Sequence, residues 1–476
     1  MRQQQLVVRR LEAFAARKAL PIRSSFELSP DPRNTLAIAT IKIVTEEQVQ
    51  AIAYGHPDEA PQVIARLDPL GRDASDLEPF ARWLIARMGA AVAANSLPRV
   101  WIPHEATLET LDVLGHRYAN NTQASDELRR MGVICRVIAR EYRHEGQQFL
   151  AVASKLLQSH VVTGQSPAED AHLGALLAWI SSPPDVDPAE LAAERSLSPA
   201  SGVLPNHPGR KDDELVEALR RDWKRASEGA RKDALAARIS DVLHRAVIEE
   251  WRLLIEARSA LWDLPLQAGA LTSCLEASSA RVLYALANGT GRSKYPLARV
   301  RDMMELEHAQ STLETARLVE DEVLRAEARA KGRALLGTVI DVEQPRAGQM
   351  PCVLTLISAQ PELRFRRDEA VVSIGSELHA RILEISAIES GTRVRLDVTA
   401  GVRKGKGLLR VGQAIEWIKH DASDPFVQSR PLQGLQVPWM FTSPDPSSPS
   451  LPRQSGPAPV GDLLAVAARH LGGTRP

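Results

Sequence analysis

Hydrophobic and polar positions near the N-terminus form short apolar runs separated by turn residues. The runs are rich in Ile, Val and Ala and comprise Thr35–Val44, Gln48–Tyr54 and Gln62–Leu67. Gly55 and Pro57 provide the turn signal between the last two. Apolar runs bounded by such residues are typical of strands. We therefore expect a short β-meander here.

Apolar residues then recur with the period of an α-helix. We expect helices at 75–94, 105–118, 123–142, 145–161 and 166–181. Two of these helices have start signals, Ser75 with Glu78 and Ser166 with Glu169. A Ser hydroxyl and a Glu side chain three residues later satisfy free amides at a helix N-terminus. A short strand is expected at Val100–Ile102.

The middle of the chain changes character twice. Residues 181–210 contain six prolines and little apolar periodicity, which predicts a Pro-rich linker. The following segment carries one apolar stripe, formed by Leu235, Ile239, Leu243, Val247, Leu254 and Leu261. A stripe of this kind indicates a helix that buries one face. An antiparallel helical bundle is the expected arrangement.

Near Gly332 the period changes from 3.6 to 2, which is typical of strands. The alternating segments are Ala334–Glu343, Cys352–Ser358, Glu362–Arg366, Ser376–Ile388, Thr392–Thr399 and Gln413–Ile418. A small closed or nearly closed antiparallel barrel, OB-like or SH3-like, protects the edges of such short strands best. The chain beyond His420 is rich in Pro and Ser, which predicts disorder.

These patterns predict an α+β fold, with a mostly helical body, a small N-terminal α/β part and a C-terminal small antiparallel β-barrel. The expected divisions are an N-terminal α/β and helical domain at 1–180, a linker at 181–210, a helical bundle at 211–332, the barrel at 333–420 and a disordered tail with a short C-terminal helix at 421–476.

Composition narrows the class of protein. The 476 residues include 59 basic and 59 acidic side chains, so the formal net charge is zero. This excludes a protein coated in basic charge for indiscriminate nucleic-acid binding. Three widely spaced cysteines, Cys135, Cys274 and Cys352, form neither a disulfide framework nor a CxxC zinc pair. We expect a cytoplasmic protein without a transmembrane helix, metal or cofactor.

No motif supports catalysis. The stretch Asn288–Lys294 is rich in glycine, but its spacing is wrong for a phosphate loop and a helix precedes it. Asp112 and His116 are spaced one helical turn apart, a spacing that solvated helix faces also show. No catalytic residue is predicted. A nuclease or hydrolase in the N-terminal domain, using Glu46, Glu47 or Asp112, is kept as an alternative.

The clearest functional signal is basic charge in the predicted barrel. The glycine-rich connection Gly401–Arg410 carries four positive charges and no negative one. Alternation places pairs of arginines on single strand faces, with Phe365 opposite one pair. Small barrels bind single strands through such loops and faces. The predicted nucleic-acid-binding residues are Arg364, Arg366, Arg393, Arg395, Arg403, Lys404, Lys406 and Arg410.

The predicted tail at 421–476 contains features that indicate a protein contact. It contains a compact apolar island and a segment, Gly461–Leu471, that fits a short amphipathic helix. A Trp left in water within a Pro-rich segment is costly, so the island is expected to dock on its own domains or on a protein partner. The predicted partner-binding residues are Trp439, Met440, Phe441, Leu463 and Leu464.

Two stretches resemble a known group of sequences. These are TGQSPAEDAHLGALLAWISSPP at 163–184 and a distal pattern that includes LRF, GSEL and VRLDVTAG. They resemble an uncharacterised family of long proteins from high-GC actinobacteria with no assigned activity. The resemblance covers about 95–420. It implies a helical body plus a barrel and supplies no catalytic residue.

We therefore expect a non-catalytic accessory or adaptor protein. In this interpretation the barrel contacts DNA or RNA, and the chain works with a separate nucleic-acid-processing ATPase or helicase. The alternative is a protein-interaction scaffold of a multi-gene bacterial system such as phage defence, which docks through its C-terminal tail. A protein partner is expected in both cases.

Overall fold

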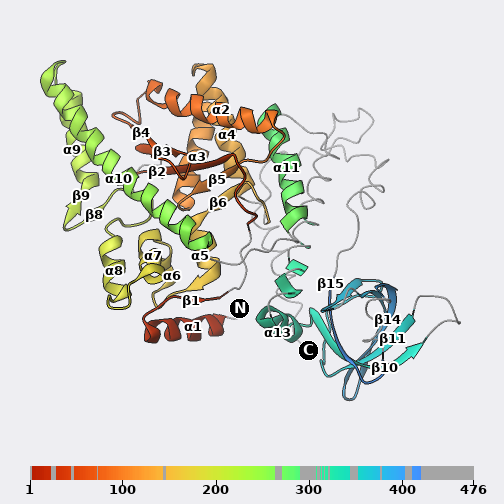
Figure 1. Ribbon diagram of the computed structural model, residues 1–476. Coiled ribbons are helices and arrows are strands. Elements are labelled where there is room, and N and C mark those ends of the chain that lie inside the picture. Colours follow the sequence, from red (N-terminus) through yellow and green to blue (C-terminus); the bar gives the residue numbers. More distant parts are fainter. Residues whose placement is uncertain are drawn as a thin grey trace, which may run out of the picture.

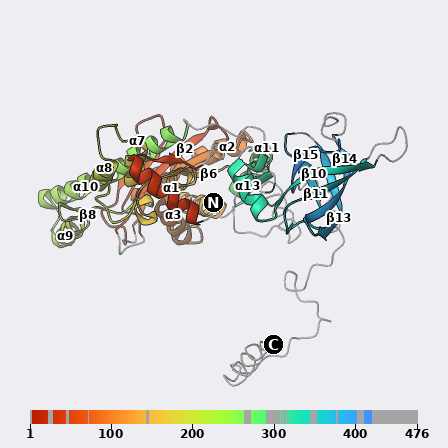
Figure 2. The same cartoon turned by 90° about the horizontal axis from the view of Figure 1, so that it is seen from below.

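The computed structural model describes residues 3–22, 28–43, 48–71, 73–142, 146–262, 271–289, 322–343, 352–375, 378–401 and 410–419, with a few positions between 307 and 319. The described chain forms an α/β body, which contains a central sheet, and a separate barrel (Figure 1). The barrel lies at one end of the structure, beside helix α13 (Glu322–Ala330), in both ribbon views (Figures 1 and 2).

The α/β body is built on a five-stranded mixed sheet with the order β4-β3-β2-β5-β6. The meander of β2, β3 and β4 is antiparallel, as the sequence predicts, whereas β5 and β6 run parallel to β2. The strands are β2 (Thr35–Ile41), β3 (Ala51–Gly55), β4 (Gln62–Ala65), β5 (Arg99–Ile102) and β6 (Leu150–Val152).

Helices cover both faces of this sheet, so every residue of β2 and β5 is buried. The face of Leu36 and Ile38 packs against α2 (Glu78–Ala93), α3 (Glu105–Tyr118) and α4 (Asp126–Glu141). Helix α11 (Leu271–Asn288) adds an outer layer against α2 and α4. The sheet and the helices on its two faces therefore form a three-layer sandwich, and α11 lies outside one of the helical layers.

Alanines form much of the second face of the sheet. Ala37, Ala39, Ala51 and Ala53 are fully buried there, under helix α10 (Ala230–Trp262). Short side chains let a helix backbone come close to the sheet. The same face also carries α5 (Ala153–His160), α7 (Leu173–Ser181) and α9 (Asp212–Arg225).

The predicted helical bundle at 211–332 is therefore wrong for its first part. The stripe of α10 is buried as expected, but it packs against the sheet as well as against the helices α9, α5 and α7. An apolar stripe indicates that one helix face is buried; it does not indicate the surface that buries it. Residues 211–262 belong to the same body as the N-terminal sheet.

The predicted linker at 181–210 is also folded. Helix α8 (Pro188–Arg195) begins with Asp187 as its cap, and Pro188 takes the first helical position, where a missing N–H costs nothing. Further on, Lys42 at the end of β2 exchanges backbone hydrogen bonds with Gly202 and Leu204, at 2.8 and 2.9 Å. The hairpin of β8 (Asn206–His207) and β9 (Arg210–Lys211) follows.

Some predicted helices have different bounds. The segment 145–161 contains β6 before α5, and the segment 166–181 is divided into α6 (Pro167–Asp170) and α7. The capping box of Ser166 and Glu169 is confirmed. Ser75 does not cap a helix; it starts a 3-10 turn (Ser75–Leu77) that leads into α2.

The C-terminal strands close into a six-stranded antiparallel barrel, which confirms the predicted closed barrel. Their order is β10-β11-β14-β13-β12-β15, and β11, β14, β13 and β12 form a Greek key. The strands are β10 (Ala334–Glu343), β11 (Cys352–Ser358), β12 (Ala370–Ser373), β13 (His379–Ile388), β14 (Gly391–Ala400) and β15 (Ala414–Lys419).

The predicted strand at Glu362–Arg366 is wrong, because this segment is an extended loop and β12 follows it. The alternation itself is real: Phe365 packs into the barrel core while Arg364 and Arg366 are exposed. Alternating burial does not require a hydrogen-bonded neighbour on each side. The loop closes the barrel at that end.

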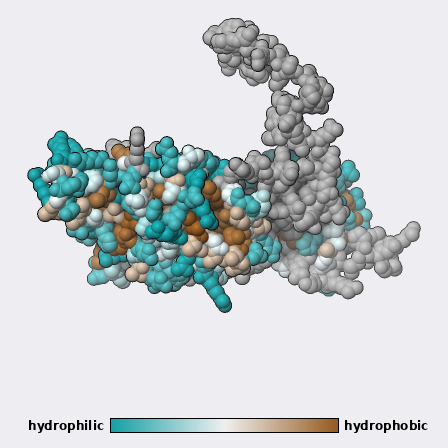
Figure 3. Space-filling view, turned by 90° about the horizontal axis from the view of Figure 1, so that it is seen from above, coloured by the Kyte–Doolittle hydropathy of each residue, from teal (hydrophilic) through white to brown (hydrophobic). Residues whose placement is uncertain are grey.

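The surface carries scattered apolar residues. Seen from above, these form small patches between hydrophilic residues (Figure 3). Helix α1 (Gln3–Ala16) exposes Val7, Leu11 and Phe14 by more than half of their surface. None of the helices in the described chain is both long and apolar enough to span a membrane.

Gly202 gives a stability test of the folded 181–210 segment. Its φ is +74°, and a Cβ there would lie 2.2 Å from Cε1 of His104. We expect Gly202→Ala to lower the free energy of unfolding by about 1–3 kcal/mol through backbone strain and by about 1–3 kcal/mol more through overpacking. Urea denaturation followed by circular dichroism measures the total loss of stability.

Gly289 is the matched control. It also has φ +74°, but an added Cβ would meet Val133 at an ordinary 3.5 Å. Gly289→Ala should show the strain alone. An equal loss of stability in the two variants would contradict the close packing of Gly202 against His104.

Candidate functional site

The described members of the predicted nucleic-acid-binding set lie in three places, at the two ends of the barrel and on the outer face of β14 (Gly391–Ala400). Because neighbouring strands are antiparallel, β10, β12 and β14 begin where β11, β13 and β15 end. We name the end of the barrel at which β10, β12 and β14 begin the Phe365 end, since the loop at 359–369 crosses it. The opposite end, where the chain passes from β14 to β15 through residues 401–413, is the Arg410 end.

The described cations at the two ends of the barrel lie far apart. Arg364 and Arg366 lie at the Phe365 end, whereas Arg410 is exposed at the Arg410 end. The ten-residue strand β14 separates the ends, and it spans about 30 Å at ~3.3 Å per residue. Arg403, Lys404 and Lys406 lie outside the described residues. Among the described cations, Arg410 is therefore at the other end of the barrel from Arg364 and Arg366.

The outer face of β14 is balanced in charge. Arg393 and Arg395 point outward, as predicted, between buried Thr392, Val394 and Leu396. Arg395 pairs with Glu343 at 3.2 Å. In the strand register Glu384 lies opposite Arg395. Neighbouring carboxylates therefore offset positive charge on this face.

The Phe365 end has a different charge arrangement. Buried Phe365 holds the loop in place, and the amide of Arg364 donates to the carbonyl of Gly332 at 2.8 Å. Arg333, next to Gly332, is exposed as well. Within the described residues, no acidic side chain forms an ion pair with the guanidinium group of Arg333, Arg364 or Arg366. The carboxylate of Glu369 accepts from the backbone amide of Arg366 at 2.8 Å. We call these three residues the arginine rim.

A pocket of about 460 Å³ lies between the end of α13 and the loop that follows β11. Arg364 and Lys331 line it, and Leu336 and Pro361 supply apolar surface. Lys331 is bound to Glu327 at 2.6 Å, and Glu362 is also part of the lining. Through Arg364, the arginine rim is thus joined to a concave surface.

The remaining predicted residues are placed as follows. Trp439, Met440, Phe441, Leu463 and Leu464 lie outside the described residues, and so do Glu46 and Glu47. Asp112 lies on an exposed face of α3, with its carboxylate 3.4 Å from His116. Among the described residues, no group of three or more His, Cys, Asp or Glu could hold a metal ion.

The structure shows a buried polar cluster that the sequence patterns did not reveal. Glu250 of α10 is 5% exposed, and its carboxylate accepts from His104 Nε2 at 3.0 Å and from the amide of Gly202 at 3.1 Å. His104 caps α3, where its Nδ1 accepts from the amide of Thr107. This fixes the tautomer, because the proton of the ring is then on Nε2.

His172 belongs to the same cluster and connects it to the surface. It is the N-cap residue of α7 and is 8% exposed. Its Nε2 is 2.9 Å from Oγ of Ser198, and its Nδ1 is buried without a hydrogen-bond partner. His172, Ser198 and Glu250 line a pocket of about 320 Å³ between α10 and the segment that follows α8.

Burial determines the electrostatics of this cluster. It lowers the pKa of His172 below the ordinary 6.5, although the negative charge of Glu250 acts in the opposite direction. Burial alone would raise the pKa of Glu250, but His104 and the amide of Gly202 bring it below 4.5. The cluster therefore contains a carboxylate and a neutral His172 at neutral pH.

One member of this cluster, Glu250, could have been recognised from the sequence. Glu250 lies three residues after Val247 and four before Leu254, so it falls within the apolar stripe of its helix. A carboxylate at such a position is buried and needs partners. No pattern in the sequence identifies the pair of His172 and Ser198, because they are 26 residues apart and meet only through the tertiary fold.

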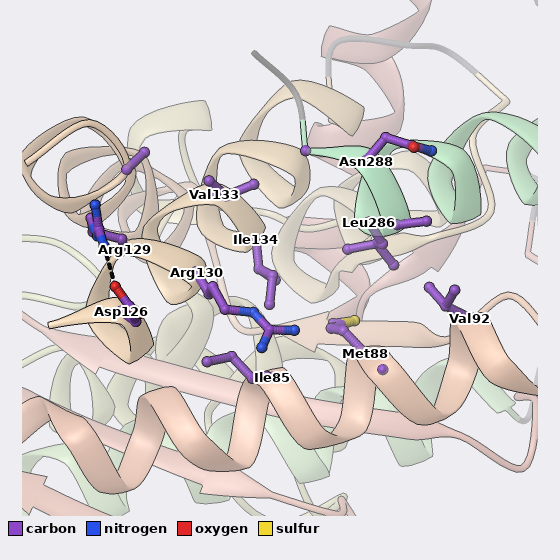
Figure 4. Close-up of a pocket in the computed structure, with 14 residues that line it drawn as sticks. Ile85, Met88, Val92, Asp126, Arg129, Arg130, Val133, Ile134, Leu286 and Asn288 are labelled. Carbon is purple, nitrogen blue, oxygen red and sulfur yellow. Dashed lines mark hydrogen bonds and ion pairs between the residues drawn. The ribbon is translucent and has the colours of Figure 1, made fainter. Parts of the chain in front are cut away.

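A larger pocket, of about 740 Å³, opens between α2, α4 and α11. Ile85, Met88, Ile134 and Leu286 line it, and the side chain of Arg130 extends between them (Figure 4). Its wall ends at Gly289, where the described part of the chain stops. We therefore infer no ligand for this pocket.

Cys135 is the described cysteine in this region, and it is buried. Burial raises the pKa of its thiol to about 12. A thiol with such a pKa stays protonated at neutral pH and is not nucleophilic.

Comparison with known proteins gives no assignment, because no protein-family model, curated protein or solved structure matches the chain. The resemblance to an actinobacterial family therefore stays a prediction.

The cluster predicts how stability depends on pH. The folded protein has a lower pKa at His172 and at Glu250 than the unfolded chain, so it binds fewer protons in acid. Stability should fall as the pH drops below 6.5, and fall again below 4.5. Urea denaturation at a series of pH values measures this. His172→Gln should remove the first decline, whereas the exposed His116→Gln should not change it.

Proposed function

We propose that this protein is an accessory protein that contacts nucleic acid through the Phe365 end of its barrel. In this proposal it works with a separate nucleic-acid-processing ATPase or helicase. The observation that supports the contact is the arginine rim, whose three side chains are exposed and unpaired by described acidic groups. Guanidinium groups bind phosphate oxygens through paired N–H donors.

The surroundings of the rim indicate the type of contact. The neighbouring pocket is lined by Leu336 and Pro361 but by no aromatic side chain. Base stacking on aromatic rings is a large source of affinity in sequence-tolerant single-strand binding. Without it, phosphate contacts dominate, so binding should be weakly sequence-specific and strongly dependent on salt.

The anchoring of the loop supports this function. Buried Phe365 fixes the backbone on both sides, so Arg364 and Arg366 start from a rigid base. The hydrogen bond from Arg364 to Gly332 holds Arg333 next to them. Cations that are already positioned lose less conformational entropy when they bind phosphate.

Two matched double variants test the contact. We expect Arg364→Gln with Arg366→Gln to weaken binding of a labelled 20-nucleotide single strand at low salt. The slope of log K against log salt should also fall in size by about 1.4, since each lost phosphate contact on a single strand contributes about 0.7. Fluorescence anisotropy over a potassium chloride series measures both quantities.

Arg381→Gln with Arg395→Gln is the control. These arginines lie on the same barrel but face Asp397 and Glu384 across the strands, so their loss should change binding little. The proposal fails if the unmodified protein shows no salt-dependent binding, or if the control variant loses as much affinity as the test variant.

The basic loop is tested separately, because its described cation, Arg410, lies at the other end of the barrel. Replacing Arg403, Lys404, Lys406 and Arg410 with Ala removes its four positive charges. Retained binding in this variant is the result expected from contact at the Phe365 end. Loss of binding in this variant alone would place the contact at the Arg410 end.

A further inference from the structure

The pocket of His172, Ser198 and Glu250 is not used by the proposed nucleic-acid contact and lies in the α/β body. It joins two features that are independent of each other. One is a histidine ring nitrogen 2.9 Å from a serine hydroxyl, and the other is a cavity of about 320 Å³ onto which both residues open. A hydroxyl, a base and a space for a substrate are the minimum set for nucleophilic catalysis.

We infer that Ser198 is a nucleophile activated by His172, and that the pocket accepts a small ester with a short apolar acyl group. This function goes beyond the accessory role proposed above, and it would overturn the expectation of a non-catalytic chain.

The surroundings of His172 favour its role as a base. The ring is 8% exposed, so water competes little for Nε2. Burial lowers the pKa of His172, which keeps the ring neutral and able to accept a proton. The negative charge of Glu250, in the same buried cluster, raises the pKa of His172 and so partly offsets the effect of burial when the ring takes up a proton.

The position at a helix end favours negative charge on the substrate. His172 is the N-cap of the nine-residue helix α7, so the Ser198 hydroxyl lies at the positive end of the helix dipole. The neighbouring Ser201 accepts from the amide of Leu173 at 2.8 Å and is thereby occupied in holding that end. A helix N-terminus favours negative charge that develops near it.

The lining of the pocket indicates the substrate class. Ile41, Leu197, Val203 and Leu253 supply apolar surface suited to a short hydrocarbon chain. A volume of about 320 Å³ is near the lower end of small-molecule sites, which span about 300–1,000 Å³. Two arginines of the lining are neutralised: Arg210 is bound to Glu249 at 3.0 Å and Arg195 to Glu256 at 2.9 Å.

The reaction is balanced with water as the second substrate. Oγ of Ser198 attacks the carbonyl carbon of the ester and forms a C–O bond, and its proton passes to Nε2 of His172. The C–O bond to the leaving alcohol breaks, and the alcohol takes that proton. Water then attacks the acyl-serine in the same way, which releases the acid and restores Ser198.

A fluorophosphonate probe tests the nucleophile directly. The serine oxygen bonds to phosphorus, fluoride leaves, and the product is a stable adduct that peptide mass spectrometry locates. With the purified full chain we expect the adduct on Ser198, no adduct there in Ser198→Ala, and a labelling rate about 100-fold lower in His172→Gln, in line with the loss of a general base. Hydrolysis of p-nitrophenyl butyrate should fall in parallel.

A second Ser–His pair provides the internal control. Ser159 Oγ is 2.9 Å from Nδ1 of His160, but neither residue lines the 320 Å³ pocket. In the Ser159→Ala variant, Ser198 should be labelled at the same rate as in the unmodified protein. Equal labelling of Ser159 and Ser198, absence of an adduct on Ser198, or full-rate labelling of His172→Gln would each overturn the inference. Circular dichroism verifies that each variant is folded.

Glu250 is assigned a positioning role, and its test is the pH profile of labelling. The charged and titratable groups around the ring are Glu250 and Glu249 of α10, Arg252 of α10, His104 at the start of α3, Glu194 and Arg195 of α8, and Arg210 of β9. The charge of Glu250 raises the pKa of His172. Glu250→Gln should therefore shift the half-maximal labelling rate to lower pH, and an unchanged midpoint would contradict this role.

Discussion

The buried carboxylate of Glu250 is the contact on which the arrangement of the α/β body depends. It joins helix α10 to His104 at the carboxyl end of β5 and to the amide of Gly202. A buried charge without partners would be strongly destabilising, so these segments must meet for the body to fold. The rest of the interface is made by Ala37, Ala39 and their neighbours, which are short enough to let α10 approach the sheet.

The barrel is organised by a different constraint, which is that six short strands must leave no open edge. Closure brings the Phe365 loop across one end, where Phe365 completes the core. The same closure places Arg364 and Arg366 on the outside. The exposed cations are thus a consequence of filling the barrel with an aromatic ring from an alternating segment.

Local patterns in the sequence predicted local structure well. The meander, the bounds of α3 and the capping box at Ser166 depend on residues close in sequence, and each is present. Contacts between distant segments could not be read in the same way. The stripe of α10 does not indicate whether a sheet or a helix buries it, and the prolines at 181–210 fit a folded segment as well as a linker. The pair of His172 and Ser198 is of the same kind.

Glu250 has a physical significance beyond folding. Burying a carboxylate carries a large desolvation cost even where it is hydrogen-bonded, so stability alone does not explain a carboxylate at this position. The carboxylate does supply fixed negative charge next to His172, in a region where little water screens it. A fixed charge costs no reorganisation when a proton moves. A cluster whose burial is costly for the fold is therefore well suited to the chemistry proposed for Ser198, and the same residues that hold α10 in place set the electrostatics of the pocket.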